Sequence, residues 1–201
     1  MKRIAVLASG RGSNFQAIID AMRSGDITAA YCCGLISDNP EAYAITRARD
    51  AGIPVNLVDF HGFSNRDEYE GRLIQVMHGT NADLFVLAGY MRILGREIVH
   101  EFAGKIMNIH PALLPSFPGL HAQRQALECG VKVAGCTVHL VDEGMDSGPI
   151  VLQECVPVIE GDTEESLSER ILEREHRCLP RAVQLFCEGR IRVEDGKVRI
   201  L

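Results

Sequence analysis

Asn108 and His110 are the residues whose types and spacing point most directly to chemistry, because an amide and an imidazole stand two positions apart in a short apolar run that Pro111 ends. Side chains alternate across a strand, so residues two apart share a face. Pro111 cannot donate to a sheet ladder and biases His110 toward extended backbone, which predicts a strand that ends at this histidine. Open α/β sheets bind ligands at the carboxyl ends of their strands. The pair is therefore predicted to lie where such a fold does its chemistry.

A hydrogen-bond donor beside a titratable ring is suited to stabilise a developing oxyanion and to move a proton, which favours acyl or formyl transfer. The structural alternative is a histidine that satisfies backbone groups at a strand end, beside an asparagine that caps a turn. Asp146, in the acidic loop 142–149, bears on this choice. If its carboxylate meets His110, it orients the ring and favours the charged form of the ring. If it does not, the loop is acidic only in the way that many surface loops are.

The loop 9–14, with the sequence Ser-Gly-Arg-Gly-Ser-Asn, directly follows the first apolar run and precedes an amphipathic segment. Glycines permit a tight turn with exposed N–H groups, and the start of a helix adds partial positive charge, which together favour phosphate binding. The loop matches neither the dinucleotide nor the nucleoside triphosphate fingerprint, so it indicates a monophosphate. A plain helix cap, in which Ser13 or Asn14 bonds the first N–H groups, is the structural alternative.

The elements that must position these residues follow from a regular alternation of apolar runs and helix-like segments. Such alternation predicts right-handed βαβ units and a parallel sheet. In the first half of the chain, strands are expected at 4–8, 30–36, 55–58 and 84–88, and helices near 14–23, 41–51, 66–79 and 95–102.

The second half is expected to contain a strand ending at 108–110, a short helix near 121–129, strands near 134–141 and 151–158, and a long helix near 163–188. The tail 190–200 alternates apolar and polar residues about Asp195 and Gly196, which predicts a hairpin. No repeat, linker or shift in composition marks a second domain. The predicted fold is one α/β domain over residues 1–201, a doubly wound, mostly parallel, Rossmann-like sheet with mixed late strands and an appended hairpin at about 190–201.

Composition narrows the classes of partner. The net charge of -6 and the absence of a dense Lys/Arg cluster argue against binding to nucleic acid or a membrane and favour a small-molecule substrate. The apolar part of the amino terminus is too short for a signal peptide or a membrane span, so a cytoplasmic protein is expected. The seven cysteines are odd in number and lack zinc-site spacing, and His121 and His139 complete no zinc pattern. We therefore expect reduced cysteines and no metal.

Five segments, taken in order, resemble the phosphoribosylglycinamide formyltransferases, folate-dependent enzymes of purine synthesis. The resemblance covers nearly the whole chain. The Asn-x-His-Pro element with its later Asp is shared by the wider superfamily of formyltetrahydrofolate-using enzymes, whereas the amino-terminal Gly-x-Gly-Ser-Asn loop and the compact length resemble the glycinamide ribonucleotide branch. The segments are 9–14, 87–94, 108–115, 118–121 and 142–149.

The resemblance implies transfer of a formyl group from the co-substrate 10-formyltetrahydrofolate to the amine of glycinamide ribonucleotide. It implies that Asn108, His110 and Asp146 are the catalytic residues. Ribonucleotide binding is implied for Gly12, Ser13 and Asn14 at the phosphate, for Asn108, and for Leu172, Glu173, Arg174 and Glu175, with Glu175 near the ribose. Folate binding is implied for Arg66, Met91, Arg92, Ile93, Leu94, Asp142, Glu143, Gly144, Met145 and Asp146, with Arg66 toward the folate tail.

Two positions depart from the pattern of the family. Some relatives carry a second histidine where this chain has Gln123, which bears on the pH behaviour of that loop. Others carry a polar side chain where this chain has Leu172, so a ribonucleotide contact here must use backbone or packing.

Three rival functions remain. A formyltetrahydrofolate hydrolase uses the same three catalytic residues with water as the acceptor, but it usually carries an extra amino-terminal regulatory domain. A methionyl-tRNA formyltransferase usually adds a carboxyl-terminal nucleic-acid-binding domain, so the chain length disfavours both. The third rival is a phosphometabolite-binding sensor without catalysis, since a fold alone does not fix a function.

Overall fold

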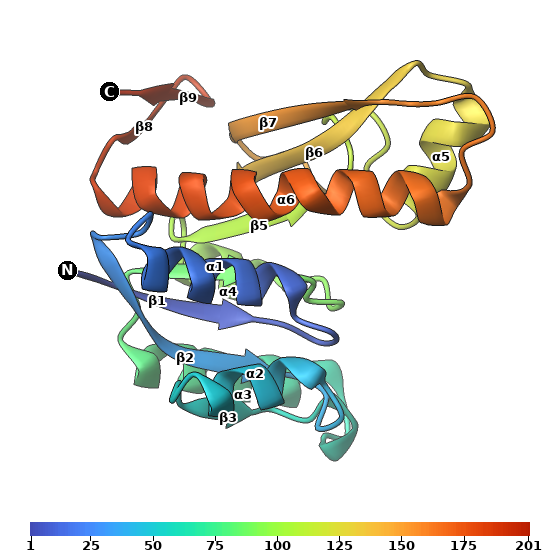
Figure 1. Cartoon of the computed structure of the whole chain (residues 1–201). Helices are drawn as coiled ribbons and strands as arrows, with labels where there is room; N and C mark the ends of the chain where they lie inside the picture. Colours follow the sequence, from blue (N-terminus) through green and yellow to red (C-terminus); the bar gives the residue numbers. More distant parts are fainter. The chain divides into compact units, whose positions relative to one another are not determined.

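The expected strands and helices are all present in the structure, a computed structural model that describes residues 1–201 (Figure 1). The elements up to residue 101 are β1 (Lys2–Leu7), α1 (Ser13–Ser24), β2 (Ala30–Ser37), α2 (Tyr43–Asp50), β3 (Val55–Leu57), η1 (Phe60–Gly62), α3 (Arg66–Thr80), β4 (Leu84–Leu87) and α4 (Arg96–Glu101). They are followed by β5 (Ile106–His110), α5 (Ala122–Cys129), β6 (Val133–Leu140), β7 (Ile150–Pro157), α6 (Glu164–Cys187), β8 (Ile191–Glu194) and β9 (Lys197–Ile200).

The short 3₁₀ helix η1 is absent from the expectation drawn from the sequence. It begins after Asp59, whose side chain accepts a hydrogen bond of 3.0 Å from the backbone N–H of His61. A side-chain acceptor of this kind stabilises a tight turn without any hydrophobic period, so the pattern of apolar residues does not reveal it.

The main sheet has seven strands in the order β3-β2-β1-β4-β5-β6-β7. β1 runs parallel to β2 and β4, β2 runs parallel to β3, and β6 and β7 are antiparallel. The prediction of a mostly parallel sheet with mixed late strands is confirmed.

The predicted hairpin is the separate pair β8 and β9, which run antiparallel. Its turn is built by Asp195 and Gly196, whose φ angles of 50° and 72° are both positive. A two-residue hairpin of this type needs positive φ at both positions, which Asp and Gly tolerate.

The chain divides into two compact units, residues 1–107 and 108–201, and the division falls within β5. In the first unit, β1 is completely buried from Ile4 to Leu7. A parallel strand covered on both faces is expected to be a continuous apolar run rather than an alternating one. The aromatic ring of Phe15 and the side chain of Ile18 on α1 are also fully buried, so β1 and α1 belong to the core of this unit.

The second unit is built around β6, β7 and α6, and α6 packs along both strands (Figure 1). The helix begins with a capping box, in which the Thr163 side chain accepts from the Ser166 N–H and the Ser166 hydroxyl accepts from the Thr163 N–H. Leu167, Ile171 and Leu179 are its largest fully buried aliphatic side chains. This packing fixes the helix that carries residues 172–175.

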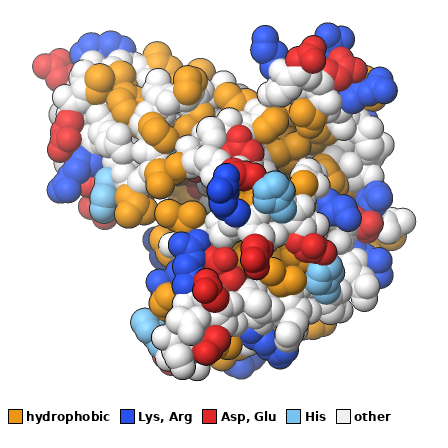
Figure 2. Space-filling view, turned by 180° about the vertical axis from the view of Figure 1, so that it is seen from behind, with side chains coloured by type: hydrophobic (Ala, Val, Ile, Leu, Met, Phe, Trp, Pro, Cys, Tyr) orange, Lys and Arg blue, Asp and Glu red, His pale blue; other side chains and the backbone are white.

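The surface carries charges of both signs. On the face shown in Figure 2, Lys and Arg side chains are interspersed with Asp and Glu and with hydrophobic side chains. None of the helices has both the length and the apolar character that crossing a membrane requires.

Candidate functional site

The strand β5 ends at His110, as the sequence predicts, and delivers two polar side chains in an otherwise apolar segment. His110 is buried, with 5% of its surface exposed, and Asn108 is half-buried. A buried polar group is costly unless it is hydrogen-bonded, so the partners of these two side chains determine what they can do.

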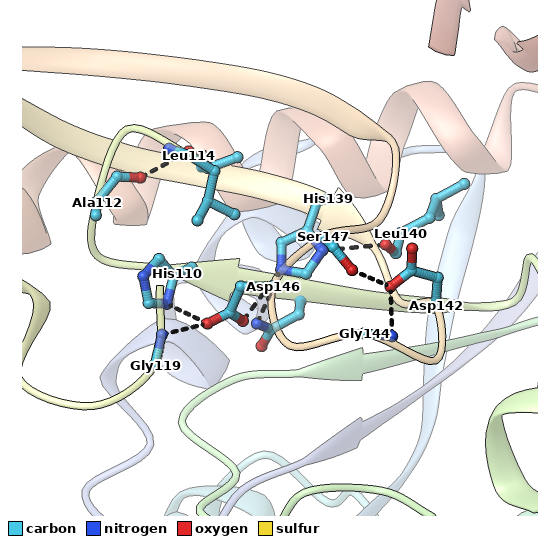
Figure 3. Close-up of polar contacts among 12 residues, drawn as sticks. His110, Ala112, Leu114, Gly119, His139, Leu140, Asp142, Gly144, Asp146 and Ser147 are labelled. Atoms are coloured by element: carbon cyan, nitrogen blue, oxygen red, sulfur yellow. Dashed lines mark hydrogen bonds and ion pairs between the residues drawn. The ribbon is translucent and has the colours of Figure 1, made fainter. Parts of the chain in front are cut away.

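His110 lies between two oxygen atoms, and Figure 3 shows the contact with the one that belongs to Asp146. Its Nε2 donates a hydrogen bond of 2.8 Å to the carbonyl of Phe117, and its Nδ1 is 3.4 Å from Oδ2 of Asp146. A carbonyl only accepts, so Nε2 carries a hydrogen, and a second proton on Nδ1 forms an ion pair with Asp146. The expected contact between His110 and Asp146 is confirmed.

His139 also contacts Asn108 and Asp146, and the sequence did not lead us to expect either contact. This buried side chain comes from β6, and Figure 3 shows Asp146 lying between it and His110. Its Nδ1 donates 3.0 Å to the carbonyl of Leu140, which leaves Nε2 to accept from Nδ2 of Asn108 at 3.2 Å. Nε2 is also 3.7 Å from Oδ1 of Asp146, so the ring pairs with that carboxylate only when it gains a second proton.

The consequence is that His139 orients the amide of Asn108. The signal that could have revealed it is a titratable residue inside the apolar run 133–140, three positions before the acidic loop. The sequence reasoning tested His139 only as a zinc ligand. The structure holds no group of three or more His, Cys, Asp or Glu side chains arranged to bind a metal ion.

Asp146 is the acceptor shared by this cluster. Its Oδ2 accepts a hydrogen bond of 2.8 Å from the N–H of Gly119 and faces Nδ1 of His110, whereas its Oδ1 faces Nε2 of His139. Burial by itself raises the pKa of Asp146, but the contact with His139, the Gly119 hydrogen bond and the charges of His110 and His139 outweigh it. The pKa of this carboxyl is therefore lowered, and it is ionised at neutral pH.

The acidic loop that carries Asp146 is organised by Asp142. Oδ1 of Asp142 accepts from the N–H of Gly144 at 3.0 Å and from the hydroxyl of Ser147 at 2.8 Å (Figure 3). Asp146 itself has a φ of 52°, a left-handed conformation that Asp tolerates better than most residues. Asp142 therefore shapes the turn that directs Asp146 inward, while Glu143 and Met145 are exposed.

The glycine loop of the first unit ends at Gly12, which is the N-cap of α1 with a φ of 66°. A Cβ atom at this position would lie 2.7 Å from Cβ of Ala44, so only glycine fits. Ser13 and Asn14 are the first residues of the helix, and the N-cap has no side-chain hydrogen bond. The plain cap by Ser13 or Asn14 is therefore not what the structure shows, and a helix start of this kind favours anion binding.

The segment 91–94 is held to the first unit through its backbone and one buried ion pair. Arg66 Nη2 donates 3.0 Å to the carbonyl of Ile93, so these two residues, both predicted to bind folate, are in contact. Nε of Arg92 is 2.9 Å from Oδ2 of the buried Asp38, and its guanidinium stacks on the ring of Phe60. The Arg92 side chain is thus an anchor, which leaves the exposed side chains of Met91 and Ile93 to meet a ligand.

Residues 172–175 lie on a separate element, the helix α6. Glu175 is buried although its side chain is ionisable, Glu173 is exposed, and Leu172 and Arg174 are half-buried. Nη1 of Arg174 is 4.0 Å from Oε2 of Glu154 on β7. The expected ribonucleotide contacts of these four residues stay predictions.

Two comparisons with other sequences identify relatives of the chain. The model of the formyl transferase family matches residues 2–183. The chain is 45% identical over 196 residues to the phosphoribosylglycinamide formyltransferase of Haemophilus influenzae, covering 98% of this chain and 92% of that protein. It is 46% identical over 189 residues to the trifunctional purine biosynthetic protein adenosine-3 of Drosophila melanogaster, covering 94% of this chain and only 14% of that much longer protein.

A comparison with solved structures gives the same result. The glycinamide ribonucleotide transformylase 1 of Symbiobacterium toebii superimposes with a TM-score of 0.97 at 51% sequence identity, covering 100% of this chain and 94% of that one. Both the sheet order and the late antiparallel strands are thus those of formyltransferase structures.

Asp146→Asn is expected to lower stability in a pH-dependent way. Because the pKa of Asp146 is lowered on folding, its carboxylate stabilises the chain above the usual unfolded value of about 3.9, and that contribution is lost as the pH falls through the lower folded pKa. At pH 7 we expect the variant to be less stable by about 1 kcal/mol, and the difference to shrink at pH 3. Urea unfolding of both proteins at the two pH values measures this.

The matched control is Asp195→Asn, which makes the same charge change at a residue with a φ of 50° in the exposed hairpin turn. The assigned contacts would be contradicted if Asp146→Asn lowered the free energy of unfolding equally at both pH values. They would also be contradicted if it lowered that free energy no more than the control does.

Proposed function

Because the chain belongs to the formyl transferase family, we propose that it transfers the formyl group of 10-formyltetrahydrofolate to the primary amine of glycinamide ribonucleotide in purine biosynthesis. The observation that carries the proposal is the cluster at the end of β5, where Asn108 and His110 are oriented by His139 and Asp146. These side chains supply two hydrogen-bond donors and a carboxylate, the groups that formyl transfer to an amine requires.

The neutral amine of the ribonucleotide attacks the formyl carbon, and the carbonyl electrons move to oxygen. The amide hydrogen of Asn108 that is not donated to His139 binds the resulting oxyanion. Both nitrogens of His110 already face an acceptor, so this ring stabilises the oxyanion through the positive charge that it carries when it is paired with Asp146, which also orients it. Collapse of the tetrahedral intermediate re-forms the carbonyl and breaks the bond to the folate nitrogen. A water molecule held by Asp146 and His110 moves the proton from the attacking nitrogen to the departing one. The amine is an adequate nucleophile, so no covalent enzyme intermediate is needed.

The ribonucleotide phosphate binds at Gly12, Ser13 and Asn14, where the first N–H groups of α1 point toward an anion. The support is the glycine N-cap, which leaves the first turn without a side-chain cap. Residues 172–175 of α6 contact the rest of the ribonucleotide, with Glu175 near the ribose. Leu172 has no hydrogen-bonding side chain, so it contributes packing or backbone only.

The folate binds against residues 91–94 and the backbone of residues 142–146, with Arg66 toward its glutamate tail. The exposed, apolar side chains of Met91 and Ile93 support this assignment, because apolar side chains suit a flat ring. Both partners are small molecules. The net charge of -6 and the interspersed surface charges support an enzyme that binds neither nucleic acid nor an anionic membrane surface, and we propose that it acts in the cytoplasm.

The proposal is tested by following tetrahydrofolate formation by absorbance, with and without glycinamide ribonucleotide. We expect turnover only when the ribonucleotide is present. Equal turnover without it would identify a hydrolase, and no turnover under either condition would identify a sensor, so both results contradict the proposal.

In the same assay, Asn108→Ala is expected to lower kcat by about 10²–10³-fold with little change in KM, because it removes an oxyanion donor. Asn56→Ala, which removes a half-buried amide from β3, is the control and is expected to keep kcat. Near-parental turnover of Asn108→Ala would overturn the role assigned to this amide.

Gly12→Ala is expected to raise KM for glycinamide ribonucleotide about tenfold or more, because left-handed backbone costs a residue with a Cβ roughly 1–2 kcal/mol and each 1.4 kcal/mol is a factor of ten. The clash with Ala44 adds to this cost. Gly25→Ala introduces the same strain at the other end of α1, with a φ of 88° and no atom within 4 Å, and is the matched control. An unchanged KM for Gly12→Ala, or an equal rise for both, would show that the loop only begins a helix.

A further inference from the structure

Ser9 joins the proposed phosphate-binding residues 12–14 to the proposed folate-binding segment 91–94, yet it belongs to neither set. This buried residue lies two positions after the end of β1 and is the first residue of the loop 9–14. Its N–H donates 3.1 Å to the carbonyl of Gly89, and its hydroxyl accepts a hydrogen bond of 2.9 Å from the N–H of Met91. Two hydrogen bonds on one residue therefore connect the loop that ends at Gly12 with the segment that begins at Met91.

The glycine loop beyond Ser9 is held from its other side. The carbonyl of Gly10 accepts from the N–H of Ala44 at 3.1 Å, and the carbonyl of Arg11 accepts from Nε of Arg47 at 2.9 Å. The carbonyl of Ser9 itself accepts from Nδ2 of Asn39 at 3.0 Å. These bonds restrain the loop between Gly12 and Ser9, so a ligand at Gly12 is connected to Ser9 by a short and restrained stretch of backbone.

The segment beyond Met91 is held at Arg92 and Ile93, through the ion pair with Asp38 and the hydrogen bond from Arg66. The side chains of Met91 and Ile93 are 67% and 70% exposed, so packing contributes little to the position of this segment. Its backbone at Met91 depends on the Ser9 hydroxyl. The loop is thus fixed at two residues after Ser9, and the segment is fixed at two residues after Met91. Between these fixed points, Ser9 is the residue that connects the loop to the segment.

We infer that Ser9 is a positioning residue that couples the binding of the two substrates, an inference that rests on the proposed function. Occupation of the phosphate site fixes the orientation of Ser9 and hence the backbone at Met91, so the folate binds more tightly. Coupling of this kind is reciprocal, because the same interaction free energy appears in both binding equilibria. Ser9 touches neither the reacting atoms nor, in this assignment, either ligand.

The test is equilibrium binding of glycinamide ribonucleotide to the chain alone and to the chain saturated with tetrahydrofolate, which has no formyl group to transfer. In the unaltered chain we expect the folate to tighten ribonucleotide binding by at least about fivefold, the lower end of typical coupling. In Ser9→Ala we expect the two dissociation constants to agree within experimental error. The Ser9→Ala substitution is expected to change the affinity for each ligand alone less than it changes the ratio of these two dissociation constants.

Ser37→Ala is the matched control. Ser37 is a fully buried serine at the end of β2, and its hydroxyl donates 2.8 Å to the carbonyl of Ala8, the residue before Ser9. Removing it deletes a buried hydroxyl from the same region without touching the bond to Met91, so the coupling should persist. The inference is overturned if Ser9→Ala keeps the ratio, if Ser37→Ala loses it equally, or if the unaltered chain shows no coupling.

A second measurement needs no variant and so does not depend on whether Ser9→Ala folds. Hydrogen exchange at the Met91 amide is expected to slow when glycinamide ribonucleotide saturates the unaltered chain, because the Ser9 hydroxyl then holds that N–H more firmly. Unchanged exchange overturns the coupling role. Failure of the ribonucleotide to bind at all would instead contradict the proposed function, which separates the two claims.

Discussion

The carboxylate of Asp146 is the group on which the arrangement of the second unit's site depends. A partly buried charge must be compensated by donors or opposite charge, and here the N–H of Gly119 and the ring of His110 lie against Asp146, with the ring of His139 3.7 Å away as a third partner when its Nε2 gains a proton. They come from β5, from β6 and from the loop between them. One charge therefore fixes three segments of chain relative to one another, and with them the directions of the two histidine rings.

β6 supports the same site from a second position. Thr137 stands two residues before His139, so the two side chains share one face of the strand. Its buried hydroxyl donates 2.6 Å to the carbonyl of Ala112 and accepts from the N–H of Leu114 at 3.0 Å. These bonds hold the turn after β5, which continues to Phe117 and places its carbonyl against His110. One face of β6 thus orients both the amide of Asn108 and the ring of His110.

Much of the fold could be predicted because it depends on local pattern. Buried parallel strands such as β1 are continuous apolar runs, and Asp195 with Gly196 marks a hairpin turn directly. The contact between His110 and Asp146 was also within reach, since His110 ends one expected strand and Asp146 lies in the loop that follows another. The boundaries of η1 could not be predicted, because they depend on a hydrogen bond from the N–H of His61 to the side chain of Asp59.

The partners of site residues were harder to predict for a physical reason. Asn108 and His139 are 31 positions apart, and Asp38 and Arg92 are 54 apart, so neither pairing leaves a periodic signal in the sequence. The guanidinium of Arg92 is bound to a buried carboxylate and anchors the segment 91–94, while the expected contact of Arg92 with the folate stays a prediction. Residue type and spacing predict which side chains reach a site, whereas the fold determines which of them face the ligand and which face each other.

The site depends on two histidines beside Asp146 whose Nε2 atoms act in opposite ways: Nε2 of His110 donates a hydrogen bond, and Nε2 of His139 accepts one. Nitrogen-15 NMR of the histidine rings in the unaltered protein measures this most directly, because the chemical shift of each ring nitrogen reports whether it carries a hydrogen. The account predicts a hydrogen on Nε2 of His110, which donates to Phe117, and on Nδ1 of His139, which donates to Leu140 while Nε2 stays unprotonated and accepts from Asn108. A neutral His139 with its hydrogen on Nε2 would contradict it, because that ring could not accept from Asn108 and could not fix the oxyanion donor.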